Sequence, residues 1–231
     1  MDPGDLLVAP CTFDAAKYAV EHWHYSKSMP AGKLVKYGVW EHGAFVGVII
    51  FSRGASPRMG LRMERRYGLA VTQWCELTRV AMTSHEVPVT QALAAAIRLL
   101  RDDNPGLRLL LSYADPGQGH RGAIYQAGNW LFTGRVVAKV DYWWQGRWRH
   151  DRVVKEAFPP EVYRKFPTRE SGGKFRYLFP LDKGMRRVVA REALPYPPPL
   201  AGEGSTVSHR ASGSEGRVRP PSPAPSDATV T

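Results

Sequence analysis

Residues 74–113 decide the fold, because they contain WCELTRVAM (74–82), TQALAAAIRLLR (90–101) and LRLLLSY (107–113) in succession. The first stretch alternates in the manner of a central strand. The second carries Ala, Leu and Ile at helical spacing, and Thr90 stands where it would cap the helix. The third is a near-continuous apolar run of strand length, which is typical of a buried sheet. A strand, a helix and a strand in this order predict a mixed α/β domain with one sheet.

The flanking sequence adds elements on both sides of this unit. His42-Gly43 predicts a hairpin turn between two strands. Residues Ser52–Leu69 are rich in Gly and Arg and are expected to be irregular. The predicted flanking elements are a helix at Asp14–His22, strands at Lys36–Trp40 and Phe45–Phe51, a short helix at Ala123–Ala127 stopped by Gly128, and a strand from Leu131 that turns at Gly134.

The composition predicts a globular, cytoplasmic protein. Hydrophobic residues make up 43% of the 231 residues, which is enough to build a core. No apolar run reaches the roughly 18 residues that span a bilayer. The N-terminus carries acidic residues where a signal peptide has basic ones. The two cysteines, Cys11 and Cys75, are too few for a disulfide framework and are expected to be reduced thiols.

The formal net charge of +11 is distributed unevenly along the chain. Residues 143–194 hold 13 basic and 6 acidic residues among many aromatics, whereas residues 1–142 hold 16 and 12. Basic side chains that neutralise phosphates, interleaved with rings that stack on unpaired bases, suit a nucleic-acid surface. An ordinary basic face over core aromatics is the alternative. We therefore divide the chain into a core (1–142), a basic extension packed on it (143–194), and a disordered Pro/Ser-rich tail (195–231). The resemblances given below imply that the core is catalytic and that the extension contacts DNA.

The loop Asp115–His120 follows the apolar strand at its carboxyl end, where ligand sites of α/β sheets gather. Its glycines would let backbone amides approach a phosphate. The alternative is a tight turn in which Asp115 caps the next helix. A carboxylate, an amide and an imidazole crowded together favour a functional site over that alternative.

Two further places hold side chains suited to chemistry. His24 and Tyr25 are adjacent in a polar loop and could exchange protons near neutral pH, although loop packing is the simpler interpretation. Within the strand 74–82, alternation places Glu76 on the face opposite Cys75 and Arg79. A buried Glu76 would need a partner, for which Arg79 or Arg53 are candidates. Cys75 is expected to be a packed thiol rather than a nucleophile.

The segment Ile124–Trp130 resembles the closing segment of GNAT acyltransferases, in which a tyrosine on a short helix precedes a glycine and an aromatic residue. The resemblance implies a GNAT-like fold and a role for Tyr125 in protonating a leaving group. The chain departs from that fold after Met82. Where the fold has a Gly-rich pyrophosphate loop, this sequence has Thr83–Pro88.

The sequence also resembles the Mom family of phage DNA-modification proteins, a GNAT-related branch. The resemblance lies in four blocks in order: HWHYSKSMPAGKLVKYGVW, WCELTRVAM, SYADPGQGH and IYQAGNWLFTG. It implies conversion of adenine in DNA to an N6-carbamoylmethyl derivative, which protects phage DNA from host restriction. It places catalytic residues at His24, Tyr25, Asp115 and Tyr125. It also suggests an iron requirement, with His24, Tyr25 and Asp115 as candidate ligands, and a donor that is a coenzyme A thioester or an aminoacyl group.

These inferences together predict a transferase that acts on double-stranded DNA. Because adenine N6 is stacked and paired in a duplex, the base must be flipped or the strand opened. We expect Asp115 to orient or deprotonate the amine. The residues expected to contact substrate are Lys33, Gln118, His120, Asn129, Trp143, Arg147 and Arg149. An acyltransferase for a small-molecule or protein amine, and a non-enzymatic basic DNA-binding protein, are the alternatives.

Overall fold

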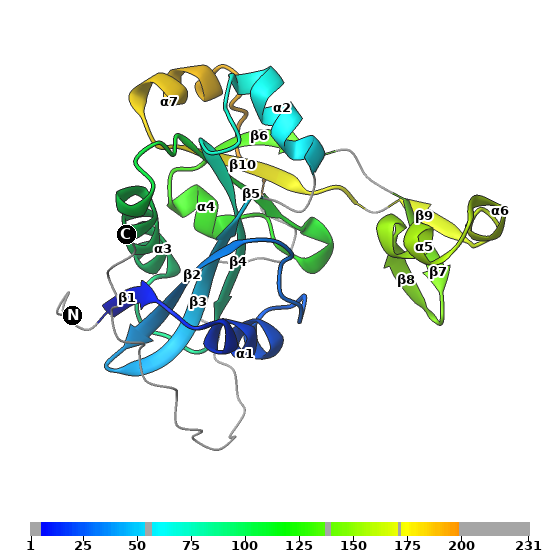
Figure 1. Ribbon diagram of the computed structural model, residues 1–231, viewed down its shortest axis with the longest axis horizontal. Coiled ribbons are helices and arrows are strands. Elements are labelled where there is room, and N and C mark those ends of the chain that lie inside the picture. The colour runs from blue at the N-terminus through cyan, green and yellow to red at the C-terminus, as the bar shows by residue number, and fades with distance from the viewer. Residues whose placement is uncertain (1–5, 54–56, 137–139, 171, 199–231) are drawn as a thin grey trace, which may run out of the picture.

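The computed structural model describes residues 6–53, 57–136, 140–170 and 172–198. It contains a seven-stranded sheet in the order β1-β2-β3-β4-β5-β10-β6 and a three-stranded sheet in the order β8-β7-β9 (Figure 1). The strands are β1 (Leu6–Pro10), β2 (Leu34–Glu41), β3 (Ala44–Ser52), β4 (Trp74–Met82), β5 (Leu109–Ala114), β6 (Leu131–Arg135), β7 (Val140–Trp144), β8 (Arg147–His150), β9 (Thr168–Glu170) and β10 (Phe175–Pro180). The helices are α1 (Phe13–Trp23), α2 (Pro57–Tyr67), α3 (Val89–Asp103), the 3-10 helix η2 (Pro116–Gln118), α4 (Ala123–Ala127), α5 (Asp151–Ala157), α6 (Pro160–Tyr163) and α7 (Lys183–Ala190).

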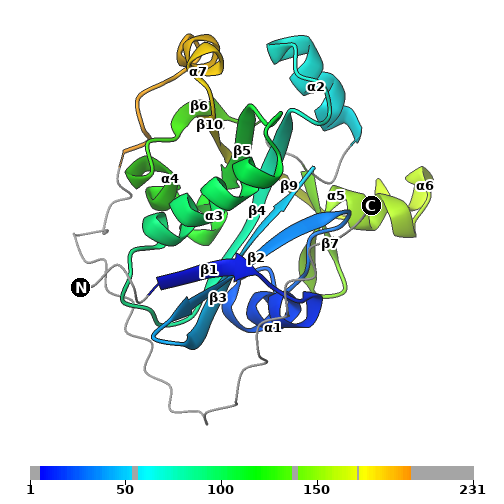
Figure 2. The ribbon, with the colours of Figure 1, turned by 60° about the vertical axis from the view of Figure 1, so that its left-hand side comes forward.

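The large sheet is mixed, because β4 and β5 run parallel while its other neighbouring strands pair antiparallel. Helices cover both of its faces (Figure 2). The apolar stripe of α3 packs with Leu110 of β5, whereas α2 and α7 pack with Leu109 and Leu111 on the opposite face. Helix α1 covers β3 on the same side as α2 and α7. The expected mixed α/β architecture is therefore confirmed.

Two local expectations are corrected. The segment 52–69 is not irregular throughout, because α2 forms there; Met59, Met63 and Tyr67, spaced four residues apart, give this arginine-rich helix its apolar stripe. Thr90 does not cap α3, since the helix begins at Val89 after Pro88 and has no side-chain cap.

The segment after residue 142 does not form one extension. Strand β10 lies between β5 and β6 in the large sheet, and α7 packs against that sheet. Strands β7, β8 and β9 with helices α5 and α6 form a separate small module, which projects to one side (Figure 1). The expected division at residue 142 therefore does not coincide with the structural one. Non-local pairing places this short strand one position from the edge of the sheet, and local sequence did not predict it.

The first residues of the expected tail, 195–198, belong to the described part of the chain. The backbone N–H of Leu194 donates to the carbonyl of Phe132 at 2.8 Å, and the Tyr196 hydroxyl donates to the carbonyl of Trp130 at 2.8 Å. These contacts fasten the chain along β6. Residues 199–231, the rest of the expected tail, lie outside the described residues. Across the part of the chain that the structure describes, we find no helix with the length and apolarity of a membrane span.

Candidate active site

Strands β4 and β5 separate halfway along their length. Trp74–Leu77 pair with Leu109–Ser112, but beyond this point β4 pairs only with β3 and β5 continues beside β10. Where the ladder ends, the Ser112 hydroxyl lies 2.8 Å from the Leu77 carbonyl oxygen and holds the two strands together. Polar side chains of the two sheet faces approach one another at this divergence.

A β-bulge in β4 corrects the predicted facing of its side chains. The register with β3 shifts between Ile50↔Arg79 and Phe51↔Leu77, so Thr78 is the extra residue. The Thr78 hydroxyl donates to the carbonyl of Ile50 at 3.0 Å. Because of this extra residue, Arg79 lies on the same face as Glu76 rather than on that of Leu77. Simple alternation across the strand could not predict it.

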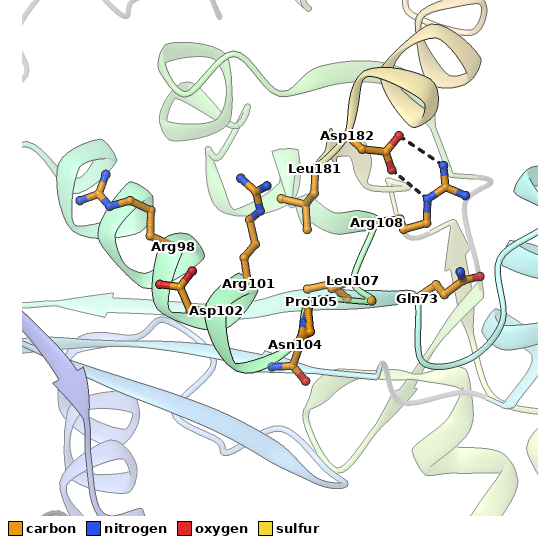
Figure 3. Close-up of a pocket in the computed structure, with 11 residues that line it drawn as sticks. Gln73, Arg98, Arg101, Asp102, Asn104, Pro105, Leu107, Arg108, Leu181 and Asp182 are labelled. Atoms are coloured by element: carbon orange, nitrogen blue, oxygen red, sulfur yellow. Dashed lines mark hydrogen bonds and ion pairs between the residues drawn. The ribbon is translucent and has the colours of Figure 1, made fainter.

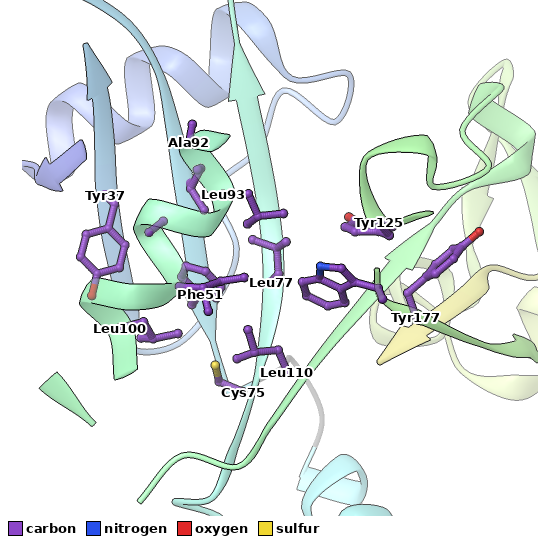
Figure 4. Close-up of a cluster of buried hydrophobic side chains, with 14 of the residues drawn as sticks. Tyr37, Phe51, Cys75, Leu77, Ala92, Leu93, Leu100, Leu110, Tyr125 and Tyr177 are labelled. Atoms are coloured by element: carbon purple, nitrogen blue, oxygen red, sulfur yellow. The ribbon is translucent and has the colours of Figure 1, made fainter. Parts of the chain in front are cut away.

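Tyr125 lies on the α3 side of the divergence, against the larger core cluster (Figure 4). Its hydroxyl is 2.8 Å from that of Ser112, and its ring packs against Trp130 and Tyr177 at centroid distances of 5.2 and 5.1 Å. Since Ser112 has a single proton and the Leu77 carbonyl can only accept, both contacts are satisfied when Tyr125 donates to Ser112. Burial raises the pKa of Tyr125 to about 12, so the phenol keeps its proton at neutral pH.

Glu76 lies on the other face of the divergence. Burial raises its pKa to about 7, while the positive charges of Lys174 and Arg79 partly oppose this rise. We find no hydrogen-bond or ion-pair partner for its carboxyl group among the described residues. Arg79 is engaged elsewhere, because its guanidinium donates to the carbonyl of Ser28 at 3.1 and 3.2 Å. The predicted pairing of Glu76 with Arg79 is therefore absent as a direct contact, and Glu76 is poised to gain or lose a proton near neutrality.

His24 and Tyr25 follow α1 and reach the same face. The His24 Nδ1 accepts the Ser26 N–H at 3.1 Å, so the neutral ring carries its proton on Nε2. Burial, together with the charges of Arg79, His120 and Lys174, lowers the pKa of His24 to about 4. The Tyr25 ring stacks on His24 at 4.3 Å and lies 5.2 Å from His120. The structure thus brings three predicted residues from two loops together.

Asp115 caps the turn that follows it, which was the alternative to a functional role for this loop. Its Oδ1 accepts the Gly117 N–H at 3.0 Å, and its Oδ2 lies 3.5 Å from Lys174 Nζ. The backbone N–H groups of Gln118 and His120 donate to the Asp115 carbonyl, and that of Gly119 donates to the Pro116 carbonyl. The amides of residues 117–120 therefore bond within the loop, and the expected backbone cradle for phosphate is not open.

The remaining predicted residues occupy several places. Gln118, Asn129 and Lys33 are exposed, the first beside His120, the second after α4 and the third ahead of β2. Trp143, Arg147 and Arg149 lie in the small module, on β7 and β8. The structure does not gather these seven substrate-contact residues into one pocket.

The small module has two unlike faces. Trp143 pairs with Trp148 across the hairpin at a ring distance of 5.2 Å, and Arg169 lies 4.7 Å above the Trp148 ring. We call Trp143, Trp148 and Arg169 the tryptophan face; Trp143 is 41% exposed. On the other face Arg149 stacks on Trp144, which packs against Phe158 of the segment after α5. Arg169, which sequence reasoning did not name, is thus better exposed beside the tryptophans than Arg149.

The structure bears on two further expectations, the packed thiol of Cys75 and the iron site. Cys75 is buried, and burial raises the pKa of its thiol to about 12, as expected of a packed thiol. Within the described ranges no three His, Cys, Asp or Glu side chains are placed to hold a metal ion. The Nδ1 of His24 is occupied by Ser26, and Asp115 is occupied by Gly117 and Lys174. An iron site therefore stays a prediction from the resemblance, and we derive no step through it.

A cavity of about 610 Å³ lies at the opposite ends of β4 and β5 (Figure 3). It is lined by residues that precede these strands, Gln73 and Arg108, and by the end of α3. Arg108 forms a two-pronged ion pair with Asp182 at its rim. None of the predicted site residues contributes to this cavity.

The mixed sheet with one parallel pair, a long helix between its two strands and a buried tyrosine after them define a GNAT-like α/β protein. The sequence profile described as the Mom protein family matches residues 5–198, so the chain belongs to that family. It is 24% identical over 208 residues to the protein named Methylcarbamoylase mom of Escherichia phage Mu, covering 84% of each chain.

Solved acetyltransferases are more distant in sequence. YncA of Salmonella typhimurium, determined with acetyl-CoA, is 11% identical and superposes with a TM-score of 0.46 over 78% of this chain and 95% of its own. A Bacillus subtilis acetyltransferase in complex with CoA is 12% identical, with a TM-score of 0.45 over 77% and 99%.

Proposed function

We propose that this chain is a DNA-modifying transferase that converts adenine in DNA to N6-carbamoylmethyl adenine. Membership in the Mom family carries the proposal, together with the relative named a methylcarbamoylase. The GNAT-like arrangement supports group transfer to an amine. In a phage-infected cell the enzyme would act in the host cytoplasm, and the altered adenine would no longer be recognised by restriction enzymes.

The two faces of the β4–β5 divergence carry complementary groups for this reaction. Glu76 takes the proton from the adenine N6 amine, and N6 forms a bond to the methylene carbon of the donor. The bond from that carbon to the leaving group breaks, and Tyr125 gives the leaving group a proton. The negative charge of Glu76 adds to the effect of burial in raising the pKa of Tyr125. A base with a pKa near 7 and an acid that stays protonated match these two tasks.

Glu76 replaces Asp115 as the proposed base. The Asp115 carboxylate is held by Gly117 and Lys174, which suits a residue that positions the loop. The exposed Tyr25 ring, stacked on His24 and near His120, offers a surface for a flipped adenine. The Nε2–H of His24 can donate a hydrogen bond to that base.

The small module supports a role in holding DNA. Its tryptophan face offers Trp143 and Trp148 for stacking on unpaired bases, with Arg169 beside them for phosphate. Flipping a base leaves a gap in the duplex, and an aromatic side chain can fill it. We assign double-stranded DNA as the partner of this face.

Nucleoside mass spectrometry of DNA from bacteria expressing the full chain tests the function. We expect a new deoxyadenosine species in which one carbamoylmethyl group replaces a hydrogen, and we expect it to disappear in Glu76→Gln and Tyr125→Phe. Lysates in which DNA is unmodified but amines are acylated would support the acyltransferase alternative. Unmodified DNA together with tight, salt-sensitive DNA binding would support a non-enzymatic binding protein.

A further inference from the structure

In the segment that follows β4, two backbone N–H groups donate hydrogen bonds to a carboxylate of the protein itself. The Glu41 carboxylate, at the end of β2, accepts the N–H of Glu86 at 2.9 Å through Oε2 and that of Val87 at 2.9 Å through Oε1. Glu41 is only 5% exposed. The two contacts form a bidentate cap immediately before α3, and Pro88 has no N–H to add.

This is the place where a GNAT-like fold has its pyrophosphate loop. An anion bound there depends on free backbone N–H groups at the start of the helix after β4. In this chain the N–H groups of Glu86 and Val87, the last two before Pro88, are already bonded to a carboxylate. A diphosphate could reach them only by displacing Glu41, which would leave a buried carboxylate without partners beside a second anion. Like charges at that distance repel, so the exchange is unfavourable.

We propose that Glu41 fills, from within the protein, the position that a GNAT-like fold gives to the diphosphate of coenzyme A, so that the donor of this chain has no nucleotide diphosphate bound there. This inference rests on the proposed function, because it concerns the donor of that transferase. The loop after β5 offers no substitute cradle, because its amides at 117–120 bond internally.

Titration of the full-length protein with coenzyme A and with inorganic pyrophosphate tests this inference. Calorimetry gives the affinity, and the amide resonances of Glu86 and Val87 report the place of binding. For the wild-type chain we expect dissociation constants weaker than about 1 mM and unmoved resonances. Micromolar binding of coenzyme A that shifts these two resonances would overturn the proposal.

The variant Glu41→Gln removes the internal charge, so that one of the two amides keeps only a neutral acceptor and the other has none. We expect it to bind pyrophosphate at least about tenfold more tightly than the wild type. Glu86→Gln is the matched control, because it removes an exposed carboxylate from the same loop but keeps the Glu41 cap. Equal gains in both variants would point to general charge rather than an opened cradle and would contradict the proposal. If Glu41→Gln does not fold, the wild-type titration alone decides.

The outcomes separate this inference from the proposed function. A wild-type chain that modifies DNA and also binds coenzyme A at these amides disproves the inference and leaves the function standing. A chain that binds no coenzyme A and leaves adenine unmodified disproves the function and leaves the inference standing.

Discussion

Replacing Glu76 by Gln is expected to stabilise the protein at alkaline pH and to abolish DNA modification. Glu76 is half-buried on β4, the described residues give its carboxyl group no direct partner, and its pKa rises from 4.5 to about 7. The amide of Gln has nearly the shape of the protonated acid and carries no charge. The substitution therefore removes the cost of keeping a carboxylate in this place, and it removes the proposed base.

The size of the effect follows from the pKa. A pKa of about 7 in place of 4.5 corresponds to about 3 kcal/mol, at about 1.4 kcal/mol for each tenfold change. The pKa already includes the opposing effect of the nearby positive charges. Partial solvent contact of the side chain screens the effect further, so we expect about 1–3 kcal/mol. In a chain of this length each kcal/mol shifts the melting temperature by about 2–4 °C.

The contribution of Glu76 to stability changes with pH in a definite direction. Because the folded-state pKa is the higher one, the folded protein holds more protons than the unfolded chain between pH 4.5 and about 7. The contribution of Glu76 to stability is thus complete below pH 4.5 and is lost as the pH rises through about 7. His24, whose pKa is lowered to about 4, acts in the opposite direction. Its effect is common to both proteins and cancels in the difference.

Thermal unfolding of the wild type and of Glu76→Gln at about pH 5 and about pH 8 measures this difference. We expect similar melting temperatures at the lower pH and a more stable variant at the higher. Glu64→Gln, which removes an exposed carboxylate of α2, should leave the difference between the two pH values unchanged. Equal stability of Glu76→Gln and wild type at about pH 8 would refute the desolvation argument. Wild-type levels of modified adenine in DNA from cells expressing the variant would refute its role as the base.

Three other substitutions test separate parts of the structure. Tyr125→Phe should lose DNA modification while its free energy of unfolding falls by only about 1 kcal/mol, because only the bond to Ser112 is removed; retained modification in a nucleoside assay would exclude Tyr125 as the acid. Trp143→Ala should weaken binding of a duplex with an unpaired base by about tenfold in a fluorescence titration, since one stacking contact is worth about 1–3 kcal/mol, and an unchanged affinity would remove the tryptophan face from the DNA contact. Gly122→Ala should lower the free energy of unfolding by more than about 1 kcal/mol in denaturant titration, because φ is +83° and the new methyl group would lie 2.5 Å from the Tyr177 ring; a neutral effect would show that this loop rearranges freely.

Local sequence predicts the parts of the fold that local physics determines. The spacing of Ala and Leu in residues 90–101 indicates α3, and the apolar run at 107–113 indicates β5. Strand β10 escapes prediction because its place depends on partners 40 or more residues away in sequence, β6 and β5. Helix α2 escapes because its arginines conceal a narrow apolar stripe that becomes apparent only when it packs.

Prediction of the candidate site from sequence is limited in the same way. The pairing of His24 with Tyr25 follows from their adjacency, and sequence analysis singled out both. Sequence analysis considered Glu76 as a carboxylate that would need a partner. That Glu76 and Arg79 lie on the same face of the sheet depends on one extra residue in β4. The cap formed by Glu41 joins residues 45 positions apart and has no local signal. Contacts of this kind arise from the register of strands, which composition and periodicity do not specify.

The small module enters and leaves the large sheet at one place. It is inserted between β6 and β10, which are antiparallel neighbours, and the N–H of Val136 donates to the carbonyl of Lys174 at 2.8 Å across its base. An insert whose two ends are a hydrogen bond apart can be lengthened, shortened or exchanged without altering the strands that carry it. If the proposed function holds, substitutions in the module could therefore change DNA binding while Glu76 and Tyr125 stay in place. DNA binding and group transfer could then vary independently within one chain.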